Sequence, residues 1–121
     1  GYVFLWLLAA EALDLDGALD RAHRAAEAAW EGEESIANLC CGLAGRAYAM
    51  LSMHRATGST RWLSRAHELA ERAASGEILD RWPMSLYKGR LGLAVLHYDL
   101  QAPELARMPF FELERIRAGR A

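Results

Sequence analysis

The chain has 121 residues and a formal net charge of −2, with acidic and basic residues interspersed. This length suits one domain with a modest core, and the lack of a basic face excludes nucleic acid and anionic membrane surfaces from the expected partners. The most apolar stretch, residues 2–10, is ended by Glu11 and Asp14 well short of the roughly 20 residues that span a bilayer. With no basic region before that stretch and only two cysteines, the reducing cytoplasm is the expected location.

The pattern of apolar residues predicts one helix after another. The first helix begins near Val3 and is apolar on nearly every side, which is typical of a helix buried among others. It ends at residues 14–17, where Asp16 is expected to cap an amphipathic, outer helix over residues 19–30. Three more helices are predicted over residues 42–56, 63–73 and 86–100. A short helical turn is expected between Pro103 and Pro109.

Two registers relate these helices to one another. A shift of 44 residues superposes the second helix on the fourth, pairing Leu19 with Leu63, Ala22 with Ala66, His23 with His67 and Ala26 with Ala70. A shift of 47 pairs Leu39 with Leu86, Gly42 with Gly89 and Gly45 with Gly92. Such periods are typical of stacked α-hairpins, each with a glycine turn, an inner helix and an outer helix. Because the shift of 44 carries Gly1 onto Gly45, we expect the chain to begin in mid-repeat, as the end of a longer protein.

Both cysteines lie in the stretch Asn38-Leu39-Cys40-Cys41-Gly42-Leu43-Ala44-Gly45. A disulfide between Cys40 and Cys41 is not expected, because neighbouring Cα atoms are about 3.8 Å apart and disulfides usually need 4.4 to 6.8 Å. A metal or a helix N-terminus would favour the thiolate form of either side chain. The two thiols therefore indicate a metal site, a reactive thiol or ordinary packing.

Three stretches together resemble the lanthionine synthetase C-like (LanC-like) family: residues 38–45 with their glycine turns, Ser85-Leu86-Tyr87-Lys88-Gly89, and Met108-Pro109-Phe110-Phe111-Glu112. The resemblance implies an all-α fold, an α/α toroid with a zinc ion at the end that carries the glycine turns. It also implies that this chain is an incomplete C-terminal segment. The implied parts are a partial hairpin (1–31), a hairpin with the Cys-Cys-Gly turn (38–75), a last repeat (85–112) and a frayed or partly helical tail (113–121).

The resemblance further implies a zinc-dependent cyclase whose substrate is a dehydrated precursor peptide. Peptide cysteine thiolates add to dehydroalanine or dehydrobutyrine and close thioether rings. Cys40 and Cys41 are the implied zinc ligands, in a Cys-Cys-Gly variant of the family's commoner Cys-His-Gly motif. The third ligand and the acid/base residues would lie before Gly1, with upstream domains of the same polypeptide, so no catalytic residue is assigned and the chain alone is expected to be inactive.

The repeat also predicts geometry at the glycine end. Tyr87 and Lys88 occupy the repeat positions of Cys40 and Cys41, so they are expected beside the thiols, on the substrate side. The first helix is expected to pack its apolar face on an earlier hairpin, so that in this chain alone four residues of that face are exposed: Val3, Phe4, Leu7 and Leu8.

Two other functional classes remain open from the sequence. One is a non-catalytic α-hairpin module that binds peptide or protein, with structural cysteines. The other is a barrel glycosidase, for which Glu33, Glu34 and Asp80 would supply paired carboxylates. The four histidines lie on helices at positions that indicate structural roles: His23, His54, His67 and His97.

Overall fold

The computed structural model describes residues 1–79 and 81–112, and over these ranges the fold is all-α. The five helices are α1 (Tyr2–Leu13), α2 (Ala18–Glu31), α3 (Leu43–Thr57), α4 (Thr60–Ala74) and α5 (Leu91–Asp99). In place of strands, this part of the chain has one isolated parallel β-bridge, between Ile36 and Glu77. None of its helices is long and apolar enough to cross a membrane. Asp80 and the predicted tail over residues 113–121 lie outside the described residues.

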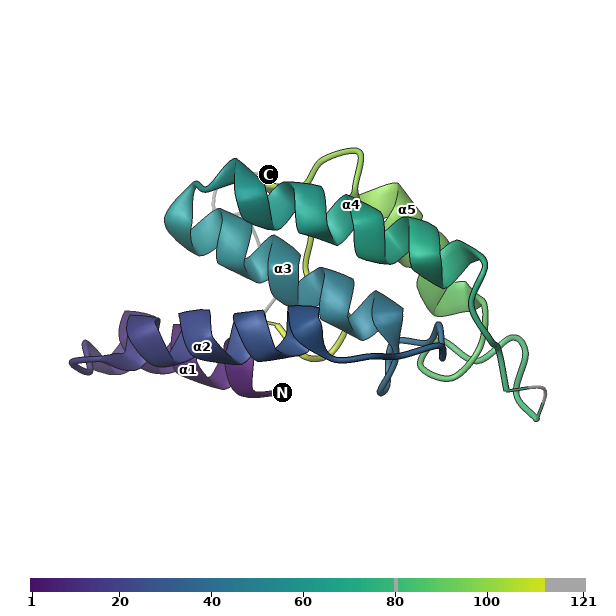
Figure 1. The fold of residues 1–121 in the computed structure, drawn as a ribbon, viewed down its shortest axis with the longest axis horizontal. Helices are drawn as coiled ribbons and strands as arrows, with labels where there is room; N and C mark the ends of the chain where they lie inside the picture. The colour runs from purple at the N-terminus through teal and green to yellow at the C-terminus, as the bar shows by residue number, and fades with distance from the viewer. Residues whose placement is uncertain (80, 113–121) are drawn as a thin grey trace, which may run out of the picture.

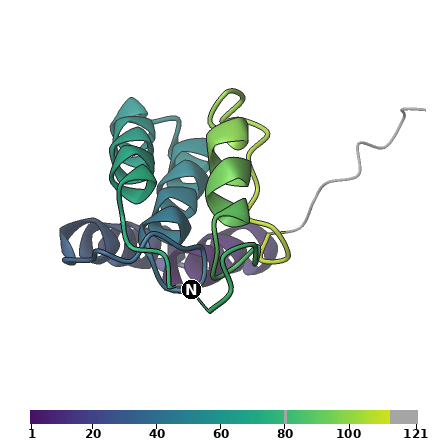
Figure 2. The ribbon, with the colours of Figure 1, turned by 90° about the vertical axis from the view of Figure 1, so that its right-hand side faces the viewer.

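Two antiparallel helical hairpins make up most of the molecule (Figure 1). The α1–α2 hairpin lies along one side of the α3–α4 hairpin, and α5 packs against both α3 and α4 (Figures 1 and 2). When the molecule is viewed from its glycine end, α3 stands between α4 and α5, with α1 and α2 running crosswise beneath them (Figure 2). This order places α3 at the centre, as the repeat predicts for an inner helix.

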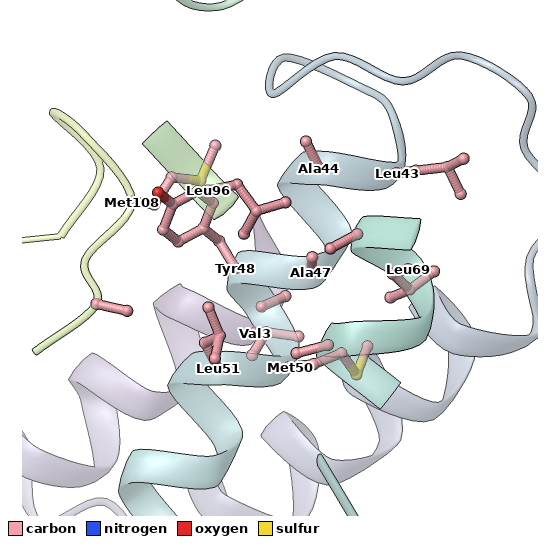
Figure 3. Close-up of a cluster of buried hydrophobic side chains, with 14 of the residues drawn as sticks. Val3, Leu43, Ala44, Ala47, Tyr48, Met50, Leu51, Leu69, Leu96 and Met108 are labelled. Carbon is pink, nitrogen blue, oxygen red and sulfur yellow. The ribbon is translucent and has the colours of Figure 1, made fainter. Parts of the chain in front are cut away.

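The core is built around α3, which buries nine of its fifteen residues (Figure 3). They are Leu43, Ala44, Ala47, Tyr48, Ala49, Met50, Leu51, Ser52 and Met53. Val3 from α1, Leu69 from α4 and Leu96 from α5 close around them. Each fully buried Leu or Met contributes roughly 1.5 to 3 kcal/mol relative to exposure. The central helix therefore supplies much of the free energy that holds the other four together.

The outer helices α2 and α4 bury the small side chains that the 44-residue register pairs. Ala22 and Ala26 in α2, like Ala66 and Ala70 in α4, are fully buried. Alanine at these positions lets each outer helix approach its neighbours closely, while the charged residues between them stay at the surface. The predicted amphipathic character of both helices is confirmed.

A cluster of charged and aromatic side chains joins the two outer helices. Glu27 on α2 forms ion pairs of 2.8 Å with both Arg61 and Arg65 on α4. The Arg65 guanidinium also lies 4.9 Å from the Trp30 ring centre and 5.0 Å from that of Trp62. Cation–π contacts of this kind each contribute about 0.5 to 1 kcal/mol at exposed sites and more when desolvated. This cluster fixes the second hairpin against the first.

Three local predictions were wrong. Asp16 does not cap α2, because Gly17 takes the N-cap position in a left-handed conformation with φ 76° and Asp16 lies one residue too early. The fifth helix begins at Leu91, since residues 85–90 form a glycine turn instead of helix. Residues 103–109 form only tight turns, because their backbone bonds span three residues, as from Ala106 N–H to Pro103 O (3.3 Å).

The expected exposed face of α1 was also largely misplaced. Val3 is buried, and Phe4 and Leu7 pack against the core of this chain. Of the four, only Leu8 is exposed as expected, and the other exposed large side chains of the helix are Tyr2, Leu5 and Leu13. Hydrophobicity on nearly every side of the helix gave no indication of which face the rest of the chain would cover.

Candidate metal centre

Two glycine turns with the same hydrogen bonds lead into α3 and α5. We name them the first glycine turn (residues 36–45) and the second glycine turn (residues 83–92). Each is closed by two backbone bonds at matching positions: Gly42 N–H to Asn38 O and Leu43 N–H to Ile36 O in the first, Gly89 N–H to Ser85 O and Arg90 N–H to Pro83 O in the second. The donors and acceptors of one turn lie 47 residues after those of the other, which confirms the predicted register.

Glycine is required in both turns because neighbouring atoms lie where a Cβ would be. A Cβ on Gly42 would lie 2.7 Å from Asn38 N and 2.8 Å from Asn38 O. On Gly45 it would meet the Leu39 carbonyl, and on Gly92 it would lie 2.6 Å from Leu39 Cγ. The close approach packs each turn tightly against the start of its inner helix.

Asn38 holds the thiols in place, and the sequence reasoning missed it. Its side chain is 1% exposed, and its Oδ1 accepts a hydrogen bond of 3.1 Å from the Cys41 backbone N–H. The Cys41 Sγ lies 3.7 Å from the same oxygen. In the second glycine turn, Ser85 Oγ accepts the Lys88 N–H at 3.2 Å in the equivalent way. The pairing of Asn38 with Ser85 under the 47-residue shift was the signal that would have identified it.

We therefore expect Asn38→Ala to destabilise the protein by about 1 to 2 kcal/mol, because the partly buried Cys41 N–H would lose its partner. Asn38→Ser is the matched control, since serine performs this role in the second glycine turn. Urea denaturation measures the free energy of unfolding of both variants. Asn38→Ser should lose no more than half of the free energy that Asn38→Ala loses. Equal losses would show that the hydrogen bond is not what stabilises the turn.

The structure brings the four residues predicted at the glycine end together. Both cysteines are free and exposed. The Cys40 N–H donates a hydrogen bond of 3.0 Å to Tyr87 O, so Tyr87 lies against the thiol-bearing turn, and its exposed neighbour Lys88 lies at the same end of the molecule. The Tyr87 hydroxyl donates to Pro109 O. Both glycine turns thus lie at one end of the helical layer, which faces the viewer in Figure 2.

The thiol environment differs from the expectation that a helix N-terminus favours thiolate. Partial burial of the Sγ atom raises the pKa of the Cys41 thiol, and the neighbouring Cys40 and Glu34 raise it further. Burial and Cys40 likewise raise the pKa of the Tyr87 phenol. Cys41 is therefore a protonated thiol at neutral pH without a nearby cation. A coordinated metal would reverse this preference, because its charge deprotonates a bound thiol.

The residues present fit a zinc site only in part. Cys40 and Cys41 offer two sulfur ligands, the type that zinc prefers in structural and catalytic sites. Across residues 1–79 and 81–112, no group of three His, Cys, Asp or Glu side chains could hold a metal ion. The described part of the chain therefore provides two ligands and leaves the coordination shell incomplete.

The other residues considered from the sequence lie elsewhere or have structural partners. His54 Nδ1 is 3.0 Å from Ser59 O, and the His23 ring lies 5.8 Å from that of Trp62. His67 and His97 are exposed on their helices. Neither of these two contacts involves the thiols.

Glu34, considered as a glycosidase carboxylate, instead holds the loop before the first glycine turn. Its Oε1 accepts backbone hydrogen bonds of 2.9 Å from both Ser35 and Ile36. These bonds, that from Ile36 above all, hold the pKa of Glu34 below its usual value. Arg46 lies 3.9 Å away. A carboxylate engaged in this way is unsuited to proton transfer, and Glu33 beside it is exposed.

A comparison with known protein families gives a match over nearly the whole chain. Residues 1–113 match the family described as Lanthionine synthetase C-like protein. The match includes both glycine turns, the adjacent cysteines and the segment from Met108 to Glu112. The chain therefore belongs to the lanthionine synthetase C-like family.

Proposed function

We propose that this chain is the C-terminal part of a zinc-dependent lanthionine synthetase-type cyclase, which closes thioether rings in a dehydrated precursor peptide. The observation that carries the proposal is the pair of exposed thiols, Cys40 and Cys41, held on a turn that is hydrogen-bonded to Tyr87. Membership of the family supports a peptide substrate. The α/α toroid belongs to the same proposal, with these helices as one sector of the ring.

In this proposal Cys40 and Cys41 provide two zinc ligands, and a third ligand comes from another part of the polypeptide. Bound zinc would supply a positive charge that lowers the pKa of a substrate thiol, so that the thiolate forms at neutral pH. The buried Asn38 side chain keeps the turn, and with it both sulfur atoms, in a fixed position. Free thiols of this kind suit a reducing compartment, and we propose a cytoplasmic location.

Ring closure also requires a proton and an anion-binding group. The peptide sulfur forms a bond to the β-carbon of the dehydro residue, the electron pair moves to the α-carbon and its carbonyl, and the α-carbon then takes up a proton. We place Lys88 on the substrate side, where its exposed ammonium can attract the developing negative charge. The Tyr87 hydroxyl donates its hydrogen to Pro109 O, so we give Tyr87 no part in proton transfer. Its role in this proposal is to hold the segment at Pro109 beside the site. The proton donor is left unassigned.

The test uses the full-length polypeptide and a synthetic peptide with one cysteine and one dehydroalanine. We expect about one zinc per chain by atomic spectroscopy. We also expect loss of the free peptide thiol, which thiol alkylation and mass spectrometry detect although cyclisation leaves the mass unchanged. Residues 1–121 alone should hold less zinc and show no turnover. A full-length protein with neither zinc nor cyclisation would contradict the proposal.

The alternative is a non-catalytic helical module that binds peptide or protein. Two observations favour it: the described residues complete no metal-binding group, and α1 exposes large apolar side chains at Tyr2, Leu5 and Leu8. In that case the full-length protein would bind the peptide with or without zinc and leave its thiol free. The assay above therefore separates the two functions.

A further inference from the structure

The segment from Met108 to Glu112 is fixed to the body of the molecule at several points. Met108 is buried, and its backbone N–H donates a hydrogen bond of 2.7 Å to Glu112 Oε2. The other carboxylate oxygen of Glu112 contacts both Ser52 and Arg55 on α3. The Phe111 ring packs against that of Phe4 on α1, with centres 5.3 Å apart. The surrounding structure thus determines the conformation of this segment.

Within this fixed segment, Phe110 has an unfavourable backbone conformation. Phe111 N–H donates to Met108 O at 3.1 Å, so Pro109 and Phe110 are the two central residues of a β-turn. Phe110 has φ 60°, in the left-handed region where this turn position is normally glycine or asparagine. A bulky side chain there is a genuine outlier. Asp14, the other non-glycine residue of positive φ among the described residues, is of a type that tolerates this conformation.

The strain is not compensated by burial of the ring. Phe110 is 90% exposed, the largest value among the exposed large hydrophobic residues of the described chain. A small or polar residue would fit the backbone better and would leave no apolar ring in water. Strained residues that the surrounding structure maintains are typical of functional sites. The packing of this chain gives no structural reason for a phenylalanine here.

The position of Phe110 indicates what its ring contacts. Pro109, directly before it, accepts the hydrogen bond from the Tyr87 hydroxyl, and Tyr87 O accepts the hydrogen bond from the Cys40 N–H. Phe110 is therefore joined to the thiol-bearing turn through two hydrogen bonds. An exposed aromatic ring on a rigid support is the usual form of an anchor for a peptide side chain, since it binds apolar groups at low entropic cost.

We propose that Phe110 is a substrate-contact residue whose ring binds an apolar or aromatic side chain of the peptide, next to the cysteine that reacts. This inference rests on the proposed function, because it takes the peptide as the ligand. It adds a preference for substrate sequence to that function. The left-handed conformation at Phe110 directs the ring away from the core of its own chain and keeps it available to the peptide.

The test compares binding of two fluorescent peptides to the full-length protein by anisotropy. Both contain one dehydroalanine and a serine in place of the reactive cysteine, so that they bind without reacting. One has phenylalanine beside the serine and the other has glycine. Phe110→Asn removes the ring and retains a residue that tolerates positive φ. Phe110→Tyr retains the ring, and Tyr98→Ala removes an aromatic side chain that is 74% exposed on α5.

We expect Phe110→Asn to weaken binding of the phenylalanine peptide about five- to tenfold and that of the glycine peptide less than twofold. Phe110→Tyr and Tyr98→Ala should change neither affinity by more than about twofold. The melting temperature of Phe110→Asn should be no lower than that of the unmodified protein, because the strain is removed. This result separates a contact role from a folding role.

The inference is overturned if Phe110→Asn leaves both affinities unchanged, or if it weakens both peptides equally. When the unmodified protein binds and cyclises its peptide, either outcome overturns the Phe110 inference alone. An unmodified protein that binds neither peptide and closes no ring overturns the proposed function together with this inference.

Discussion

Cys41→Ala in the full-length protein is expected to lose most of its zinc, whereas Cys41→His should retain about one zinc per chain. Under the proposed function Cys41 is a ligand, and removing one of three protein ligands should weaken binding by about a hundredfold or more, beyond the 10- to 100-fold effect of losing an outer-shell partner. Imidazole is also a good zinc ligand, so histidine restores the ligand count. Zinc content after dialysis against a weak chelator measures the difference.

Lys88→Ala is the matched control for this experiment. Lys88 occupies the position in the second glycine turn that Cys41 occupies in the first, and both backbone N–H groups donate to a side-chain oxygen. Because Lys88 is not a zinc ligand in the proposed function, the Lys88→Ala variant should keep its zinc. It should lose peptide cyclisation, because it lacks the ammonium that attracts the developing negative charge. Equal zinc in Cys41→Ala, Cys41→His and the unmodified protein would show that Cys41 binds no metal.

Gly45→Ala is expected to destabilise the protein by about 3 kcal/mol, at the upper end of the usual cost of overpacking. The added Cβ would overlap the Leu39 carbonyl, and a backbone atom in a hydrogen-bonded turn cannot move away as a flexible side chain can. A loss of this size should lower the melting temperature by about 10 °C in a domain of this length. Thermal unfolding followed by circular dichroism measures it.

Gly32→Ala provides the comparison for Gly45→Ala. The nearest atom to its added Cβ is Arg46 Nη1, at 2.8 Å, which is the far end of a flexible side chain. A shift of Arg46 accommodates the methyl group but weakens its hydrogen bonds to Ala29 O and Gly32 O, so the melting temperature should fall by about 5 °C, half of the effect expected for Gly45→Ala. Similar losses in both variants would show that the close approach of Leu39 O is not the reason for glycine at position 45.

The arrangement of the glycine end could be predicted from the sequence because the chain repeats. Once Gly42 is paired with Gly89, the neighbours of each turn follow, and the hydrogen bond from Cys40 N–H to Tyr87 O confirms that the thiols lie beside Tyr87. The all-helical fold followed in the same way from the apolar pattern. Both inferences depend on spacing, which a sequence shows directly.

The rest depends on interactions that spacing does not show. The cap of α2 depends on the left-handed conformation of Gly17, which excludes Asp16 from that position. The exposed face of α1 depends on which neighbours are present, since the helix is apolar almost all round. The raised pKa of Cys41 depends on partial burial and on the neighbouring Cys40, which only the folded turn determines.

The difference between the two registers has a practical consequence for protein engineering. The outer helices repeat after 44 residues and the glycine turns after 47, so the connection from α4 to the second glycine turn holds three additional residues. The turn keeps its hydrogen bonds in spite of them. Lengthening a flexible loop is inexpensive, at about 0.6 kcal/mol for each doubling. This connection is therefore a suitable place to add residues without disturbing the second glycine turn.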